Sequence, residues 1–179
     1  MAEQGDELVG EVLLSEEQIR ERITELGAEI ARDYAGKDPI LVAVLKGAFI
    51  FMADLARAVQ IPLEVDFMAV SSYGASTRSS GVVRIVKDLD IDLGGRHVII
   101  VEDIVDSGLT LRYLRKTLES RGTASLEVCA LLVREGSQSE LDLRYIGFRL
   151  PPAFVIGYGL DVAERYRNLP RIAVYEGDE

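Results

Sequence analysis

One stretch of thirteen residues, VIIVEDIVDSGLT at positions 98–110, constrains the fold of this chain more than any other. Residues 98–101 are apolar without alternation, which is typical of a strand covered on both faces of a parallel sheet. Glu102 and Asp103 follow, where this strand is predicted to leave the core. Residues 106–110 are mostly small or polar, and regularly spaced leucines after them favour a helix. The stretch therefore predicts a buried strand, a polar loop and a helix in direct succession.

The predicted loop has the chemistry of a phosphate-binding site. A helix N-terminus presents free backbone N–H groups and the positive end of the helix dipole, and both favour an anion. Ser107 and Thr110 add hydroxyl donors, and Gly108 allows a close approach of the backbone. Glu102 and Asp103 can accept hydrogen bonds from a ribose diol or face Mg²⁺. These groups fit a sugar phosphate, and the alternative interpretation is a helix-capping loop beside two solvated acids.

The length and composition favour one enzyme domain. A chain of 179 residues, with 48% hydrophobic and 28% charged residues, is long enough for one substantial core, so residues 1–179 are expected to form one domain. The net charge of −10 argues against a general nucleic-acid-binding or anionic membrane surface. The polar N-terminus does not resemble a signal peptide, no apolar stretch approaches about 20 residues, and Cys129 is the only cysteine. We therefore expect a soluble cytoplasmic enzyme without nucleic-acid or membrane partners.

Segments typical of strands and helices alternate along the chain. The predicted strands cover residues 39–45, 63–72, 82–86, 98–101, 125–133, 154–156 and 172–174, and the predicted helices run from the capping residue Ser15 to about Tyr34, over 48–59 and after Gly108. Residues 1–10 and 177–179 are predicted as loose tails. The alternation predicts an α/β fold, with a mainly parallel central sheet and helices on both faces. Ligands of such sheets bind beyond the carboxyl ends of the strands, so Lys46 and Gly47 are expected on the same rim as the acidic pair.

The polar loop also carries a resemblance to a known family. Residues 102–108 resemble the ribose-phosphate signature of the type I phosphoribosyltransferases. Further segments narrow the resemblance to the hypoxanthine-guanine phosphoribosyltransferases, namely residues 45–48, 71–74, 154–161 and 166–170. These segments occur in the order found in that family and span the chain from about Leu13 to Tyr175.

The resemblance implies a fold and a reaction. The fold is type I phosphoribosyltransferase-like, with a small hood that we expect the N-terminal helix and the C-terminal segments to form. The reaction joins hypoxanthine or guanine to 5-phosphoribosyl 1-pyrophosphate in the presence of Mg²⁺, and it gives IMP or GMP and pyrophosphate. The family also implies a homodimer or a homotetramer.

The resemblance assigns roles around the sugar phosphate. The 5′-phosphate is expected on Asp106, Ser107, Gly108, Leu109 and Thr110. Asp106 is also expected to be the catalytic base that accepts or shares the proton of purine N7. Glu102 and Asp103 are expected to hold the ribose hydroxyls and the metal. Pyrophosphate is expected on Lys46, Gly47 and Arg167, with a cis peptide bond between Lys46 and Gly47.

Other residues are assigned to the purine and to a closing loop. The base is expected on Arg134, Phe154, Val155 and Asp161. In this assignment Phe154 stacks on the purine, and Asp161 lies near the exocyclic amine of guanine or contributes to metal binding. Ser72 and Tyr73 begin a flap over residues 73–81 that is expected to exclude water. Without the resemblance, Phe154 and Val155 would be ordinary core residues and the flap a disordered connection.

Two positions depart from the family pattern. Arg134 stands where the family usually has a lysine that donates to purine O6, and Gln138 stands where many relatives have an arginine directed at pyrophosphate. Arginine and lysine are not equivalent donors, so the preference among hypoxanthine, guanine and xanthine stays open.

Two alternative functions remain. One is a transferase of the same fold that prefers xanthine or uracil. The other is a regulatory protein that senses phosphoribosyl pyrophosphate, although the sequence has no basic cluster for a nucleic acid.

Overall fold

A computed structural model of the protein describes residues 7–72, 83–136 and 142–177. Their main sheet has six strands, which from edge to edge are β4 (Val83–Lys87), β3 (Glu64–Ser72), β2 (Ile40–Leu45), β5 (His97–Val105), β6 (Ser125–Arg134) and β7 (Tyr145–Leu150). Every neighbouring pair is parallel except β3 and β4, which are antiparallel. The predicted α/β fold with a mainly parallel sheet is therefore confirmed.

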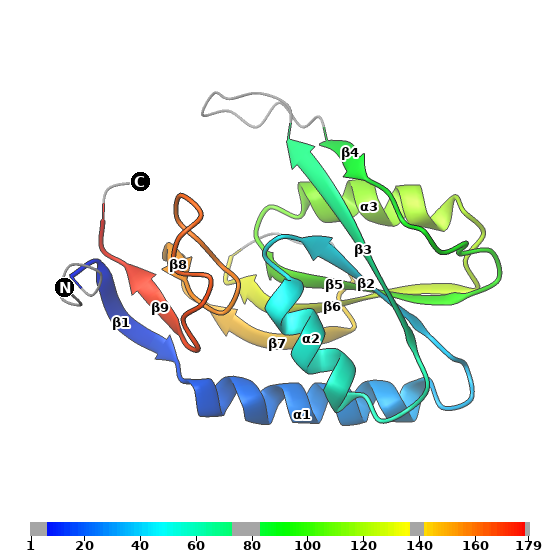
Figure 1. Ribbon diagram of the computed structural model, residues 1–179, viewed down its shortest axis with the longest axis horizontal. Helices are drawn as coiled ribbons and strands as arrows, with labels where there is room; N and C mark the ends of the chain where they lie inside the picture. The colour runs from blue at the N-terminus through cyan, green and yellow to red at the C-terminus, as the bar shows by residue number, and fades with distance from the viewer. Residues whose placement is uncertain (1–6, 73–82, 137–141, 178–179) are drawn as a thin grey trace.

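Helices cover both faces of this sheet (Figure 1). Helices α1 (Glu16–Asp33) and α2 (Phe49–Ala58) pack on one face, and α3 (Leu109–Glu119) packs on the other. The position of β5 between two covered faces explains why its apolar run does not alternate with polar residues. Ile99 and Val101 belong to the hydrophobic cluster under α1 and α2, whereas Val98 and Ile100 belong to the cluster under α3. Successive side chains of a strand point to opposite faces, so a sheet with two covered faces needs apolar residues at every position.

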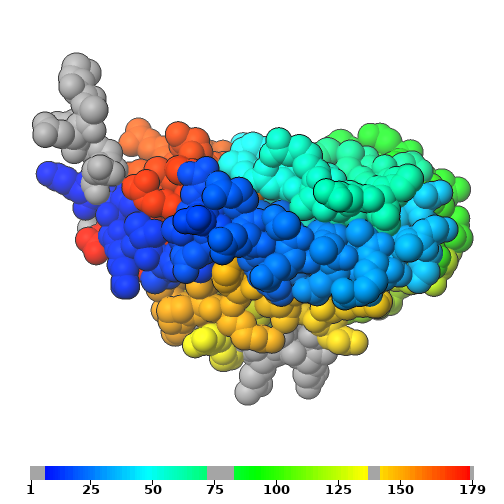
Figure 2. Space-filling model, turned by 90° about the horizontal axis from the view of Figure 1, so that it is seen from below, coloured from blue at the N-terminus to red at the C-terminus, as the bar shows by residue number. Residues whose placement is uncertain are grey.

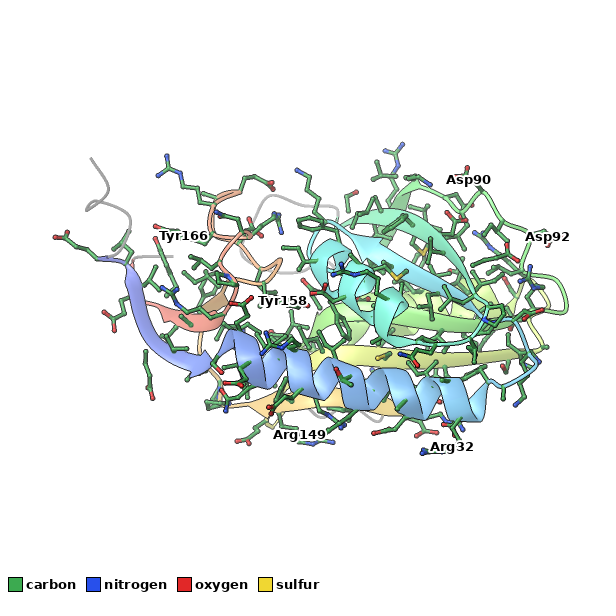
Figure 3. The ribbon with its side chains drawn as sticks, turned by 60° about the horizontal axis from the view of Figure 1, so that its bottom comes forward. Arg32, Asp90, Asp92, Arg149, Tyr158 and Tyr166 are labelled. Carbon is green, nitrogen blue, oxygen red and sulfur yellow. The ribbon has the colours of Figure 1, made fainter. Side chains whose placement is uncertain are left out.

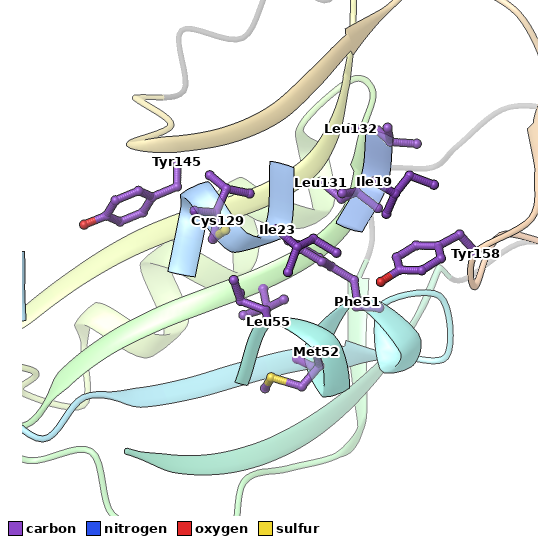
Figure 4. Packing of buried hydrophobic residues seen from close by; sticks show 14 of the residues in the cluster. Ile19, Ile23, Phe51, Met52, Leu55, Cys129, Leu131, Leu132, Tyr145 and Tyr158 are labelled. Carbon is purple, nitrogen blue, oxygen red and sulfur yellow. The ribbon is translucent and has the colours of Figure 1, made fainter. Parts of the chain in front are cut away.

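The cluster under α1 and α2 fixes these helices to the sheet (Figure 4). Ile23 of α1 and Phe51 and Leu55 of α2 are at most 4% exposed. Burying each such side chain contributes about 1.5–3 kcal/mol to the stability of the fold. Cys129 of β6 lies in the same cluster, as predicted for a core residue, and burial raises the pKa of its thiol.

A second sheet joins the two ends of the chain (Figure 1). Its strands, in order, are β1 (Val9–Leu14), β9 (Ile172–Tyr175) and β8 (Val155–Ile156), and both pairings are antiparallel. The prediction of a loose tail is wrong for Val9 and Gly10, which belong to β1, and residues 1–6 lie outside the described residues.

The structure also corrects the predicted composition of the hood. Helix α1 packs on α2 and on the main sheet, and β1 is the N-terminal element that pairs with the late strands. The apolar stripe of α1, at Ile19, Ile23, Leu26 and Ile30, is buried in the main core. A helix with such a stripe is most stable against a large apolar surface, which the main sheet provides. Viewed from below, α1 crosses the molecule between α2 and β7 (Figure 2).

Strand β7 is not predicted by the sequence, because its pairing depends on distant residues. The guanidinium of Arg22 in α1 donates to the carbonyl oxygens of Ile146 and Gly147 at 2.8 and 3.1 Å. A Cβ added to Gly147 would lie 2.4 Å from the carbonyl oxygen of Leu131, so glycine allows the two strands to approach.

No helix in the described part of the chain combines the length and apolar character needed to cross a membrane.

Candidate active site

The predicted phosphate loop lies between β5 and α3. Residues 102–111 line a hollow of about 250 Å³ at this junction. Gly108 is the N-cap of α3 and has a φ of 75°, a left-handed conformation that favours glycine. This N-cap residue makes no side-chain hydrogen bond to the helix. The hydroxyl of Ser107 accepts only a long hydrogen bond, of 3.5 Å, from Leu109 N. The first turn of α3 therefore keeps backbone N–H groups for an anion in the hollow.

Glu102 and Asp103 lie inside β5 rather than beyond its end. β5 stays paired with β6 as far as Val105, opposite Val133, because the apolar run of β6 continues there. The expectation that the strand leaves the core at residue 101 is therefore wrong. Glu102 is only 7% exposed, and its burial, followed by the charge of Asp103, raises its pKa well above the ordinary value. Burial also raises the pKa of Asp103, so a nearby cation or hydrogen-bond donor would stabilise both carboxylates.

Gly47 lies against both Asp103 and the C-terminal loop. A Cβ added to Gly47 would lie 1.7 Å from Asp103 Oδ2, so a side chain there would displace the carboxylate. A Cβ added to Gly159 would lie 2.2 Å from the carbonyl oxygen of Gly47. The structure has a cis peptide bond at this turn, but the bond joins Leu45 and Lys46. The expectation of a cis bond between Lys46 and Gly47 is therefore wrong by one residue.

Lys46 and Arg167 meet at the loop that follows β8. Arg167 Nη1 donates to the carbonyl oxygen of Gly159 at 2.7 Å, and Nη2 lies 3.0 Å from Asp161 Oδ1. Glu164 connects the two cations, with Oε2 3.0 Å from Lys46 Nζ and Oε1 3.2 Å from Arg167 Nη2. The structure thus brings the residues assigned to pyrophosphate together. The structure also places Glu164 at this site. Its partner Lys46 lies 118 positions away in the chain, so no local sequence pattern could have identified the pair.

Arg134 extends from the end of β6 toward the phosphate loop. Its Nε lies 3.5 Å from Asp106 Oδ2, and its Nη1 donates to the carbonyl oxygen of Ala153. The Asp106 side chain is 69% exposed, so its carboxylate is accessible to a substrate. Arg134 therefore links the residue assigned to proton transfer with the segment assigned to the base.

The remaining base residues lie at the small sheet. Phe154 is half-buried, and its ring packs edge-on against Tyr175 with 5.8 Å between the ring centroids. Val155 is buried in β8 and pairs with Val174. Both residues have a packing role, as their interpretation without the family resemblance predicts.

The predicted flap begins at the end of β3. Ser72 is the last residue of β3 and pairs with Val83 at the start of β4. Tyr73, Gln138 and the flap over residues 73–81 lie outside the described residues.

The carboxylates at this rim fit a magnesium ion that arrives with phosphate groups. Within the described ranges, no group of three or more His, Cys, Asp or Glu residues could hold a metal ion alone. Mg²⁺ is usually bound by one or two carboxylates, with waters and substrate phosphates completing the octahedron. Buried Glu102 and half-buried Asp103, whose pKa values are both raised, are suited to form such a pair. Asp161, the third residue assigned to the metal, is ion-paired to Arg167.

A larger hollow of about 550 Å³ lies between α1, α2 and the C-terminal loop. The Tyr158 hydroxyl donates to Asp54 Oδ2 at its wall (Figure 3), and burial together with this hydrogen bond raises the pKa of Tyr158. The same aspartate is ion-paired to Arg57. This hollow lacks the acidic pair and the uncapped start of α3, which both lie at the smaller hollow, so the smaller hollow is the candidate active site.

Comparisons with known proteins agree with this geometry. Residues 11–163 match the family model described as Phosphoribosyl transferase domain. The chain is 54% identical over 172 residues to the hypoxanthine-guanine phosphoribosyltransferase of Mycobacterium tuberculosis, with 92% of this chain and 85% of that protein covered. It is 50% identical over 167 residues to the protein of the same name from Bacillus subtilis, with 93% of each covered. A hypoxanthine phosphoribosyltransferase structure from Staphylococcus aureus matches with a TM-score of 0.92 at 41% identity, covering 98% of this chain and 96% of that one.

Proposed function

The chain belongs to the phosphoribosyl transferase family and, within it, to the hypoxanthine-guanine phosphoribosyltransferases, and from this membership we propose its reaction. The protein joins hypoxanthine or guanine to 5-phosphoribosyl 1-pyrophosphate and gives IMP or GMP and pyrophosphate. One observation supports this most strongly: the uncapped start of α3, the acidic pair of Glu102 and Asp103, and the pair of cations meet at one rim of the main sheet. These three features suit the three parts of one substrate, namely its 5′-phosphate, its ribose and its pyrophosphate.

The sugar phosphate is proposed to bind across the loop before α3. Backbone N–H groups of residues 106–110 and the hydroxyls of Ser107 and Thr110 donate to the 5′-phosphate. Glu102 and Asp103 accept hydrogen bonds from the two ribose hydroxyls. A sugar held at both ends has its reacting carbon fixed relative to the base, which lowers the entropic part of the barrier.

The leaving group is proposed to bind at Lys46, Gly47 and Arg167. Breaking the bond between C1 and oxygen leaves positive charge on the sugar and negative charge on pyrophosphate. Two cations that already lie together at this rim would stabilise that negative charge. When bound at Glu102 and Asp103, Mg²⁺ would neutralise further charge on the leaving group.

The purine is proposed to lie between Asp106 and the small sheet. The accessible carboxylate of Asp106 is suited to take the proton of N7 if the base lies within hydrogen-bond reach. Phe154 stacks on the ring, the backbone of Val155 faces its edge, and Asp161 lies near the exocyclic amine of guanine. Arg134 contributes a donor on the same side as Asp106.

The assembly and the cellular compartment are proposals that rest on family membership. We propose a homodimer or homotetramer in the cytoplasm. The single cysteine, Cys129, is buried and free, which is consistent with a reducing compartment. Light scattering of the purified protein would distinguish the oligomeric states.

The decisive experiment is nucleotide formation from phosphoribosyl pyrophosphate and Mg²⁺ with hypoxanthine, guanine, xanthine, adenine and uracil in parallel. Turnover of hypoxanthine or guanine is the expected result. Dominant xanthine or uracil turnover would keep the chemistry and change the specificity. Binding of phosphoribosyl pyrophosphate without turnover of any base would contradict the proposed reaction and favour a sensor.

A further inference from the structure

Glu164 binds both cations that are assigned to pyrophosphate. Its Oε2 accepts from Lys46 Nζ at 3.0 Å, and its Oε1 lies 3.2 Å from Arg167 Nη2. One carboxylate therefore engages the donors that an oxygen of pyrophosphate would need. We propose that Glu164 is a positioning residue that holds Lys46 in the free enzyme and competes with pyrophosphate for both Lys46 and Arg167, an inference that rests on the proposed function of this site.

The local backbone holds Glu164 at this position. Val162 and Arg165 exchange backbone hydrogen bonds of 3.2 and 3.0 Å, and the two residues between them, Ala163 and Glu164, have φ values of 48° and 64°. Positive φ at both central positions is the type I′ turn, where glycine and asparagine are the usual residues. The Glu164 N–H also donates to Asp161 Oδ2 at 2.9 Å. The turn is thus fixed by its own hydrogen bonds, although a residue with a long side chain occupies the position.

The next turn of the loop is anchored from the other side. Tyr166 (Figure 3) packs its ring against Tyr175 of β9, with 6.1 Å between the ring centroids. Arg167 follows and is held by the carbonyl oxygen of Gly159 and by Asp161. Arg167 therefore stays in place without Glu164, whereas the positions of Lys46 and Glu164 depend on each other.

The exposure of these side chains makes the exchange with pyrophosphate easy. The side chains of Lys46 and Glu164 are 66% and 64% exposed, whereas that of Arg167 is 18% exposed. Exposed ion pairs are weak, so an anion of higher charge displaces the carboxylate readily. The hydrogen bonds from Lys46 and Arg167 lower the pKa of Glu164, so the competing group carries its charge at neutral pH. The displaced carboxylate stays beside the leaving group and favours its release.

The test compares E164Q with E25Q as a matched control. Glu25 lies on α1, its side chain is 63% exposed, and it pairs with Arg22 at 2.6 Å. Calorimetry with Mg²⁺ present should show the dissociation constant of pyrophosphate about three to ten times lower in E164Q, and unchanged in E25Q. The difference should shrink in high salt, because charge competition is screened. E164A should change the constant in the same direction, which keeps the test valid if E164Q folds poorly.

Steady-state kinetics provide the second readout. The inhibition constant of pyrophosphate should fall in E164Q while the KM for hypoxanthine stays unchanged. An unchanged or higher dissociation constant of pyrophosphate in E164Q would overturn the inference. If the wild-type protein forms no nucleotide and E164Q still binds pyrophosphate more tightly, the proposed function fails and the competition stands.

Discussion

The guanidinium of Arg134 bridges Asp106 and the carbonyl oxygen of Ala153. Its Nε lies 3.5 Å from Asp106 Oδ2, and its Nη1 donates to that carbonyl oxygen. The side chain is only 21% exposed, so its position is restricted by its surroundings. The residue proposed to take the purine proton is therefore oriented by a residue proposed to face the purine. The proposed base recognition and the proposed proton transfer would therefore be coupled through this one side chain.

The substitution R134K should reveal this coupling. Lysine carries all its N–H donors on one nitrogen, so it cannot span Asp106 and the carbonyl oxygen of Ala153 with separate nitrogens as the planar guanidinium does. We expect kcat/KM for hypoxanthine to fall about 10-fold, the cost of roughly one charge-assisted hydrogen bond, with the KM for phosphoribosyl pyrophosphate unchanged. Steady-state kinetics on both substrates measure this. R149K, at an exposed position of β7, is the control (Figure 3). An equal effect of R134K on the two substrates would contradict the coupling.

The substitution D106N should separate binding from chemistry. Asparagine keeps the shape and the capping ability of aspartate but cannot accept a proton. Loss of a general base typically lowers turnover by about 10²–10⁴-fold. We expect that loss in kcat while the dissociation constant of phosphoribosyl pyrophosphate changes less than about threefold, since backbone N–H groups supply most of the phosphate contacts. Turnover equal to that of the wild-type protein would remove Asp106 from the proton transfer.

Features that depend on local sequence could be predicted. The apolar run at residues 98–101 predicts a strand buried on both faces, and Ile99 and Ile100 do belong to opposite clusters. The capping box at Ser15 is also present, with Gln18 as its partner. In both cases the residues that determine the structure are neighbours in the chain. The position of the phosphate loop follows from the same strand and helix pattern.

Features that depend on distant residues could not be predicted. β5 continues through Glu102 and Asp103 because β6 pairs with it there, and an acidic pair in a sequence does not reveal its partner strand. β1 forms because β9 offers it an edge at the other end of the chain. Glu164 joins the site only through Lys46, and no local pattern links them.

The substitution G159A should disturb the turn at Lys46 and Gly47. Gly159 has a φ of 99°, and an added Cβ would lie 2.2 Å from the carbonyl oxygen of Gly47. The matched control is G122A, because Gly122 has a φ of 76° with open space around it. The left-handed conformation alone costs about 1–2 kcal/mol, so the control should lose that much stability and G159A more. Only G159A should weaken pyrophosphate binding, and equal binding losses in both variants would contradict the contact.

The substitution D66N should change the pH dependence of stability. Asp66 is 6% exposed and accepts backbone N–H groups from Phe67, Asp90 and Ile91 at 2.8, 2.8 and 2.9 Å. Burial alone would raise its pKa, but these hydrogen bonds hold the pKa below the ordinary value. A lowered folded-state pKa adds stability above the unfolded pKa of about 3.9, and this stability is lost as the pH falls through the folded-state value.

We therefore expect D66N to lose about 1–3 kcal/mol at pH 7, the cost of weakening a buried set of charge-assisted hydrogen bonds. The difference in unfolding free energy between D66N and the wild-type protein should shrink below about pH 4, where the Asp66 carboxylate begins to protonate in the unfolded chain. Urea unfolding at pH 7, 5 and 3.5 measures both effects. D92N is the control (Figure 3), because Asp92 is exposed and accepts only from Gly94 N at 3.0 Å among the described contacts. A loss that is the same at all three pH values would show that the shape of Asp66, rather than its charge, stabilises the connection between β4 and β5.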